Sequence, residues 1–227
     1  MDEKIKTMIG KEIDLLKNYP KTKRNILERA NQKTEADRAI ARKFDKEFFD
    51  GDRKHGYGGF YYNPRFWQPV IQDFIKYWKL RKNSSVLDVG CAKGFMLHDL
   101  KEFIPSITIS GIDISKYAIE NSLADVKNFL RVGNANNIPF KDNSFDVVIS
   151  INTIHNLELN ECAKALKEIS RVSRKYSFIT VDAYRNQEEK KSMLAWNLTA
   201  KTIMSVNEWK IFFKENNYCG DYYWFTP

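Results

Sequence analysis

The sequence predicts an α/β protein with a doubly wound, mostly parallel sheet, helices on both faces and a helical N-terminal arm. Three observations predict this fold. From Ser84 onward, short apolar runs alternate with helical patterns, as in parallel sheets. A turn containing an acid and glycines follows the first run, where open α/β sheets bind ligands. The 227 residues, 43% of them hydrophobic, suffice for one such domain with a large core but not for two.

The arm and its following loop are predicted over residues 1–65, and the sheet domain over 66–227. Apolar positions at helical spacing between Ile5 and Leu16 indicate a helix that ends before Pro20. A second helical pattern runs over Lys23–Phe49. Residues 51–64 contain four of the ten glycines, mixed with aromatics, so we expect a ligand-facing loop there or, alternatively, a tight connection.

The sheet domain opens with an amphipathic helix over residues 66–80. The expected strands are Ser85–Val89, Ile107–Ile112, Phe129–Val132, Phe145–Ile151 and Tyr176–Val181. The expected helices between them are Gly94–Phe103, Lys116–Val126 and Asn160–Ser173. The tail is predicted to add a helix over Asn207–Asn216 and an aromatic strand over Tyr222–Phe225, and Leu198–Ser205 is a candidate for one more strand.

Composition narrows the function classes. Three cysteines without a C-x-x-C pair indicate reduced thiols, with neither a disulfide framework nor a metal site. Residues 1–11 show no signal-peptide core and no apolar run approaches a membrane span, so we expect a cytoplasmic protein without a membrane partner. The formal charge of +8 comes from basic residues interleaved with acids, which favours a solvated surface over a nucleic-acid partner and leaves the second open.

The strongest motif runs from Val86 to Phe95 and reads V-L-D-V-G-C-A-K-G-F. Gly90 and Gly94 are separated by three residues, unlike the G-x-G-x-x-G pattern that receives a pyrophosphate, so we expect no phosphate and disfavour a dehydrogenase. Asp88 supplies a negative charge that suits a ligand with an ammonium group. Alternatively, Asp88 only pins the turn by accepting hydrogen bonds from backbone amides.

Three further segments follow in order. Asp113 ends the second strand 23 residues after Gly90, where an acid can accept hydrogen bonds from ribose hydroxyls or cap a helix. Asn134 follows the third strand and can accept from and donate to an adenine edge, or serve as a turn residue. The fourth segment, residues 142–150, leads into Asn152 and His155.

These four segments, in this order, resemble the motifs of class I S-adenosylmethionine-dependent methyltransferases of the methyltransferase-domain type, over roughly residues 84–182. The resemblance implies a Rossmann-like fold with S-adenosylmethionine as cofactor and S-adenosylhomocysteine as product. It implies contacts to the methionine part from Asp88, Gly90, Cys91, Gly94 and Asn152, to the ribose from Asp113, and to the adenine from Ile114, Asn134 and Ala135. Ala92 stands where many members have a second glycine, and Asn134 where many have aspartate.

Transfer from a sulfonium needs an acceptor held in line and, where the acceptor carries a proton, a base. His155 is the best candidate base because its ordinary pKa lies near neutrality, and the alternative is a histidine that only packs. His55 and Tyr57 are rivals in the glycine-rich loop, and Tyr57 is also a candidate lid residue. Near the end of the fifth strand, Asp182, Tyr184 and Arg185 either recognise a polar or anionic acceptor or are ordinary loop residues.

The leading hypothesis is an enzyme that methylates a small molecule, with a sugar or surface-glycan precursor as the working idea, acting as a monomer or homodimer. The alternatives are an RNA or protein methyltransferase that uses the basic surface, and a module that binds S-adenosylmethionine without catalysis. A clustered basic face and salt-sensitive RNA binding would favour the first alternative. Cofactor binding without turnover would favour the second.

Overall fold

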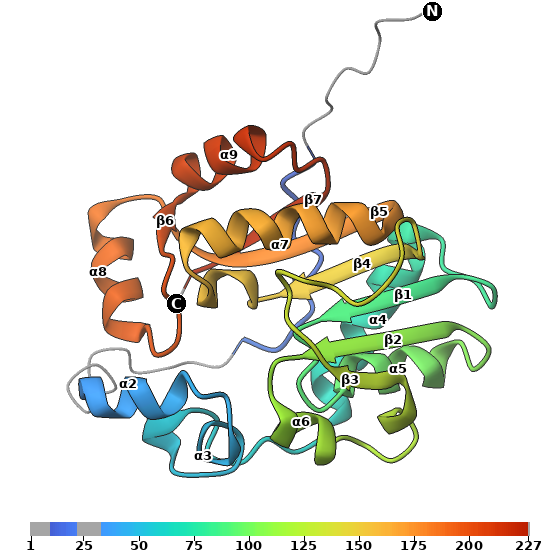
Figure 1. Ribbon diagram of the computed structural model, residues 1–227, viewed down its shortest axis with the longest axis horizontal. Helices are drawn as coiled ribbons and strands as arrows, with labels where there is room; N and C mark the ends of the chain where they lie inside the picture. The colour runs from blue at the N-terminus through green and yellow to red at the C-terminus, as the bar shows by residue number, and fades with distance from the viewer. Residues whose placement is uncertain (1–9, 22–32, 227) are drawn as a thin grey trace, which may run out of the picture.

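The computed structural model describes residues 10–21 and 33–226, and within them the chain forms a sheet with helices on both faces (Figure 1). The strand order is β3-β2-β1-β4-β5-β6, and β7 also pairs with β5. All of these pairings are parallel, which confirms the predicted sheet. The strands are β1 Ser85–Val89, β2 Thr108–Asp113, β3 Leu130–Val132, β4 Phe145–Ile151, β5 Ser173–Tyr184, β6 Met204–Ser205 and β7 Asp221–Phe225.

Two layers of helices cover the sheet. One apolar core joins β4 and β5 to α7 and α9, and the other joins β1, β2 and β4 to α4 and α5. Figure 1 shows α7 in front of the strands and α4 and α5 behind them. The helices of this domain are α4 Pro64–Trp78, α5 Phe95–Phe103, α6 Lys116–Glu120, α7 Leu159–Val172, α8 Gln187–Trp196 and α9 Val206–Glu215.

Helix α7 shows how the sequence specifies a layer. Five of its residues recur at helical spacing and are fully buried, while the opposite face is charged. The buried stripe consists of Cys162, Ala165, Leu166, Ile169 and Val172. It packs on β4, whose residues are buried as far as Ser150, as expected for a parallel strand covered on both faces.

Strand β5 is longer than the predicted Tyr176–Val181 because two partners extend its ladder. β7 pairs with Phe178–Asp182, and β6 continues the same edge beside Ala183 and Tyr184. The aromatic strand predicted over Tyr222–Phe225 is therefore confirmed, whereas the candidate stretch 198–205 supplies only the two residues of β6. Helix α6 is shorter than predicted and ends at a cap formed by Asn121.

The arm differs most from the prediction. Ile5, Met8 and Ile9 lie outside the described residues. The described residues 10–21 are not helical, because Ile13 donates its N–H to the Tyr222 carbonyl and the Tyr222 N–H bonds to Lys11, so this segment covers the edge of β7. Tertiary pairing therefore overrides the helical spacing of Ile13 and Leu16.

The second predicted arm helix, Lys23–Phe49, lies partly outside the described residues and is broken in the rest. Its described part forms α2 Glu35–Ala41 and α3 Lys46–Phe49. The break occurs at Phe44, whose φ of 50° is left-handed, and Asp45 then caps α3. A short 3-10 helix, η1 Arg53–His55, follows in the glycine-rich loop. In the part of the chain that the structure describes, no helix has the length and apolarity to span a bilayer.

Candidate functional site

The glycine turn connects β1 to α5 at the carboxyl edge of the sheet. The N–H groups of Gly90 and Cys91 both donate to the Ile112 carbonyl, at 2.8 and 3.0 Å, which fastens the turn to β2. A Cβ on Gly90 would lie 2.0 Å from Thr153 Oγ1, and φ is +89°, so only glycine fits. Ala92 takes the left-handed conformation with φ of +47°, so the turn keeps a glycine-like shape without a second glycine.

Two buried carboxylates lie beside this turn. Asp113 Oδ2 accepts from the Ala92 N–H and Oδ1 from the Ser115 N–H, both at 2.8 Å. Burial raises the pKa of Asp113, and those two bonds oppose the rise. Asp88 is only 6% exposed, and no donor within the described chain bonds to its carboxylate. Burial, together with the charge of Asp113, raises the pKa of Asp88 to about 8.

The ends of β2 and β3 present an apolar surface and an amide. Ile114, directly after Asp113, is 54% exposed although it is a large aliphatic residue. Ala135 is buried. Asn134 Oδ1 accepts from the Asn136 N–H at 3.1 Å, so this oxygen closes a turn, in agreement with the simpler interpretation of that residue. An exposed aliphatic side chain beside a buried acid suits the flat ring of a nucleoside.

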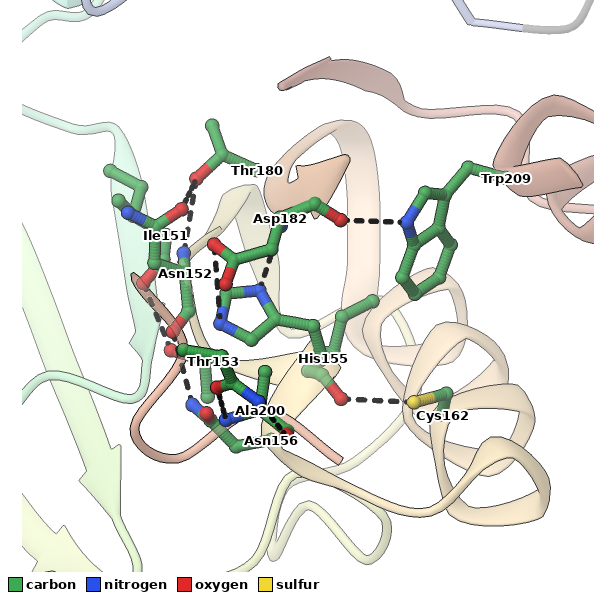
Figure 2. A network of polar contacts seen from close by, with 12 residues as sticks. Ile151, Asn152, Thr153, His155, Asn156, Cys162, Thr180, Asp182, Ala200 and Trp209 are labelled. Carbon is green, nitrogen blue, oxygen red and sulfur yellow. Dashed lines mark hydrogen bonds and ion pairs between the residues drawn. The ribbon is translucent and has the colours of Figure 1, made fainter. Parts of the chain in front are cut away.

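A separate polar network joins the ends of β4 and β5 (Figure 2). Asn152 donates its N–H to Thr180 Oγ1 at 3.0 Å, and that hydroxyl donates to Asn152 Oδ1 at 2.8 Å. The Asn152 carbonyl accepts from Asn156 Nδ2 at 3.2 Å. The Asp182 carbonyl accepts from Trp209 Nε1 at 2.9 Å. These groups largely bond to one another, so the network fixes the two strand ends.

His155 belongs to this network and is 4% exposed. The Asp182 backbone N–H donates to Nδ1 at 3.0 Å, so the neutral ring carries its proton on Nε2, which lies 3.7 Å from Asp182 Oδ1. Burial lowers the pKa of His155, opposed by Asp182, and burial raises the pKa of Asp182. The Nδ1 lone pair, which a base would use, therefore already accepts a hydrogen bond from the backbone of β5.

The other predicted acceptor residues have local partners. Tyr57 is 42% exposed and its ring lies against Phe49 and Phe60 in the arm. His55 lies between two carboxylates, 3.2 Å from Asp37 and 3.4 Å from Glu47. At the end of β5, Tyr184 and Arg185 contact acids of α9 and α8.

The arm bridges the two sides of the carboxyl edge through two contacts that the sequence did not indicate. On the side of β1, Asp50 pairs with Lys93 of the glycine turn at 2.7 Å. On the side of α8, Lys33 Nζ donates to the Trp196 carbonyl at 2.6 Å. The sequence held one signal for the contact with Asp50, namely Lys93. A long cationic side chain is unusual in a turn of small residues and indicates a partner elsewhere in the chain. The arm therefore contacts segments on both sides of the strand ends, and Figure 1 shows α2 and α3 beyond those ends, below α8.

Comparisons with known proteins agree with this geometry. A family model described as a methyltransferase domain matches residues 80–217. A tRNA (carboxymethyluridine(34)-5-O)-methyltransferase of Arabidopsis thaliana is 30% identical over 143 residues, which are 62% of this chain and 33% of that protein. A demethylmenaquinone methyltransferase of a Geobacillus species is 36% identical over 110 residues, 44% of this chain and 45% of that protein. The chain thus matches less than half of the length of these relatives.

Solved structures share the fold. The YcgJ protein of Bacillus subtilis has a TM-score of 0.52 at 22% identity, covering 64% of this chain and 66% of that one. A structure described as a SAM-dependent methyltransferase from Methanosarcina mazei has a TM-score of 0.50 at 19% identity, covering 63% and 82%. Likeness at such identity concerns the fold alone.

Proposed function

Because the chain belongs to the family of class I methyltransferase domains, we propose that it transfers the methyl group of S-adenosylmethionine to a small-molecule acceptor in the cytoplasm. The observation that carries the proposal is the Asp88 carboxylate, buried beside the glycine turn with no donor from the described residues. A buried acid without a partner is costly, and a cationic ligand group would offset that cost. We further propose that residues 66–227 form the methyltransferase domain and residues 1–65 its covering arm.

The residues of the turn and of β2 fit such a cofactor. Asp88 would bind the ammonium group of the methionine part, with Gly90, Cys91 and Gly94 around it. Asp113 keeps free lone pairs beyond its two backbone bonds and would accept from the ribose hydroxyls. The cofactor supplies an activated methyl group on a sulfonium, so this chain's residues mainly bind and orient.

The adenine would lie on the exposed side chain of Ile114. Asn134 has its Oδ1 committed to a turn, and its Nδ2 is left to donate to a ring nitrogen, next to the small Ala135. Asn152, at the end of β4, would line the methionine side. Its side-chain oxygen is bonded to Thr180, so we infer that it shapes the pocket through the strand end.

For the acceptor proton, the geometry favours a pair over a single histidine. His155 Nδ1 is engaged by the Asp182 N–H, whereas Nε2–H lies toward the Asp182 carboxylate. We propose that Asp182, with the pKa raised by burial, takes the proton where the acceptor carries one, and that His155 positions it. Tyr57 remains the proposed lid residue.

The position of the arm supports the proposal of a small acceptor. Its contacts to Lys93 on one side and to the Trp196 carbonyl on the other hold it across the strand ends, which suits an enclosed substrate better than a folded RNA. A sugar or surface-glycan precursor is the working hypothesis. The similarity to the Arabidopsis protein named as a tRNA methyltransferase supports RNA as the alternative acceptor.

Methyl-labelled S-adenosylmethionine tests the proposal. The purified chain is incubated with a small-molecule extract, with total RNA and with protein, and the label is followed into each fraction. We expect label in the small-molecule fraction, lost in Asp182→Asn and kept in Asp73→Asn, because Asp73 belongs to α4 and its carboxylate accepts from Asn18. Label in RNA or protein alone would overturn the small acceptor, and cofactor binding without any transfer would indicate a non-catalytic module.

A further inference from the structure

Asp50 is the centre of a partly buried polar junction in the arm. Its Oδ2 accepts from Lys93 Nζ and from the Tyr117 hydroxyl, both at 2.7 Å, and its Oδ1 accepts from the Phe60 N–H at 2.9 Å. These donors come from the glycine turn, from α6 and from the glycine-rich loop. One carboxylate therefore joins the arm to two segments at the ends of β1 and β2.

Lys93 is 5% exposed, which is rare for an ammonium group. Besides Asp50, it donates to the Phe60 carbonyl at 2.9 Å, and the rings of Tyr61 and Tyr117 lie 5.6 and 5.9 Å from Nζ. Lys93 follows Ala92, whose N–H bonds to Asp113. Lys93 belongs to the glycine turn by sequence, but its hydrogen-bond and ring partners lie in the arm and in α6.

Asp50 stays ionised across the physiological range. Burial would raise the pKa of Asp50, but the bonds from Lys93, the Phe60 N–H and Tyr117 outweigh it and hold this pKa below its ordinary value. The hydrogen bond to Asp50 raises the pKa of Tyr117 to about 12, so its hydroxyl remains a donor. The ionised Asp50 therefore remains an acceptor of charge-assisted hydrogen bonds.

Aromatic packing continues the same contact. Phe60 stacks on Phe95, the first residue of α5, with centroids 4.9 Å apart, and Phe49 lies near Tyr117 at 6.4 Å. The arm thus rests on the segment after the glycine turn and on the helix after Ile114. Both segments are parts of the proposed cofactor site, so the junction lies where arm and site meet.

We propose that Asp50 is a positioning residue that latches the arm to the cofactor turn and thereby sets how long the cofactor stays bound. By fixing Lys93 and Tyr117, it holds the glycine turn and the start of α6 in one relative position, and it keeps the arm over them. Release of the cofactor then requires the bonds of Asp50 to Lys93 and Tyr117 to break. This inference rests on the proposed function.

Dissociation kinetics of S-adenosylhomocysteine test the latch, using the full chain. Asp50→Asn keeps the size and removes the charge, and Lys93→Met removes the ammonium. Each should raise the dissociation rate about tenfold or more with little change in the association rate, and the double variant should not exceed the larger single effect by much. Asp50→Glu should restore part of the slow release. Asp52→Asn, an exposed cap in the same loop, is the matched control and should release at the wild-type rate.

Each outcome has a distinct meaning. Faster release with an unchanged melting temperature of the ligand-free chain supports the latch. A lower melting temperature with unchanged release would show a purely structural bond and overturn it. If Asp50→Asn fails to fold, Tyr117→Phe, which removes one donor, gives the same comparison on a smaller scale. If the wild-type chain binds no S-adenosylhomocysteine, the proposed function fails first and the latch fails with it.

Discussion

The two halves of the carboxyl edge differ in how their polar groups are satisfied. At the ends of β1 and β2, Asp88 lacks a donor from the described chain and Ile114 is exposed. At the ends of β4 and β5, His155 and Asn152 are bonded to neighbouring strands. Since buried polar groups are normally paired, the half that leaves a carboxylate without a partner is the half shaped for a ligand. The other half holds the strands together and carries the His155–Asp182 pair that we propose for the acceptor proton.

The largest expected effect concerns Asp88. Asp88→Asn should weaken S-adenosylhomocysteine binding about 100-fold, because a charge-assisted bond to the ammonium group is lost. Calorimetric titration measures it. Asp146→Asn is the matched control: this carboxylate is also buried but lies at the amino end of β4 and pairs with Arg174 and Lys175, so the variant should lose stability and keep affinity. Equal affinity losses would show that Asp88 affects binding through stability and not through a contact with the ligand.

The same carboxylate should make stability depend on pH. The pKa of Asp88 in the folded chain is about 8, above the ordinary 3.8, so its contribution is fully present below pH 3.8 and is lost as pH rises through 8. Between pH 6 and 8 the free energy of unfolding of the wild type should fall by about 2 kcal/mol. The free energy of unfolding of Asp88→Asn should not show this fall. Thermal unfolding of both proteins across this range measures the difference. Parallel curves would show that Asp88 is already ionised in the free protein.

His155→Ala should lower stability, and it should lower turnover only through the lost positioning of Asp182. It leaves the buried Asp182 N–H without an acceptor, which costs roughly 1–3 kcal/mol and lowers the melting temperature by about 3–10 °C. His98→Ala, which removes a pair with Asp125 on the outer side of α5, should cost less. A loss of turnover with unchanged stability, together with loss of the acidic limb of the pH–rate profile, would instead make His155 the base.

The smallest expected effect concerns the shape of the turn. Ala92→Gly should stabilise the chain by about 0.5–1 kcal/mol, because glycine takes the left-handed conformation without strain. The greater conformational entropy of glycine in the unfolded chain cancels part of this gain. Cofactor affinity should stay unchanged. Chemical unfolding measures the gain, and a loss of stability would show that the Ala92 methyl makes a packing contribution larger than its strain.

The features that depend on residues close together in sequence could be predicted from the sequence. The alternation of strands and helices, the turn from Asp88 to Gly94 and the acid at Asp113 all follow from short-range sequence. The arm could not be predicted this way. The pairing of Lys11–Ile13 with Tyr222 and the bond of Asp50 to Lys93 join residues far apart in sequence, and the left-handed Phe44 carries no sequence signal. The state of His155 depends on a backbone N–H of another strand, which its own sequence neighbours do not reveal.

Calorimetric titration of the wild-type chain at pH 7, in two buffers of different ionisation enthalpy, tests the central claim most directly. S-adenosylhomocysteine should bind and release close to one proton, because the ligand ammonium favours the ionised form of an Asp88 whose pKa is about 8 in the free protein. NAD, titrated in parallel, should give no heat of binding. Binding of NAD without binding of S-adenosylhomocysteine would contradict the account, and binding of S-adenosylhomocysteine without proton release would remove Asp88 from its centre.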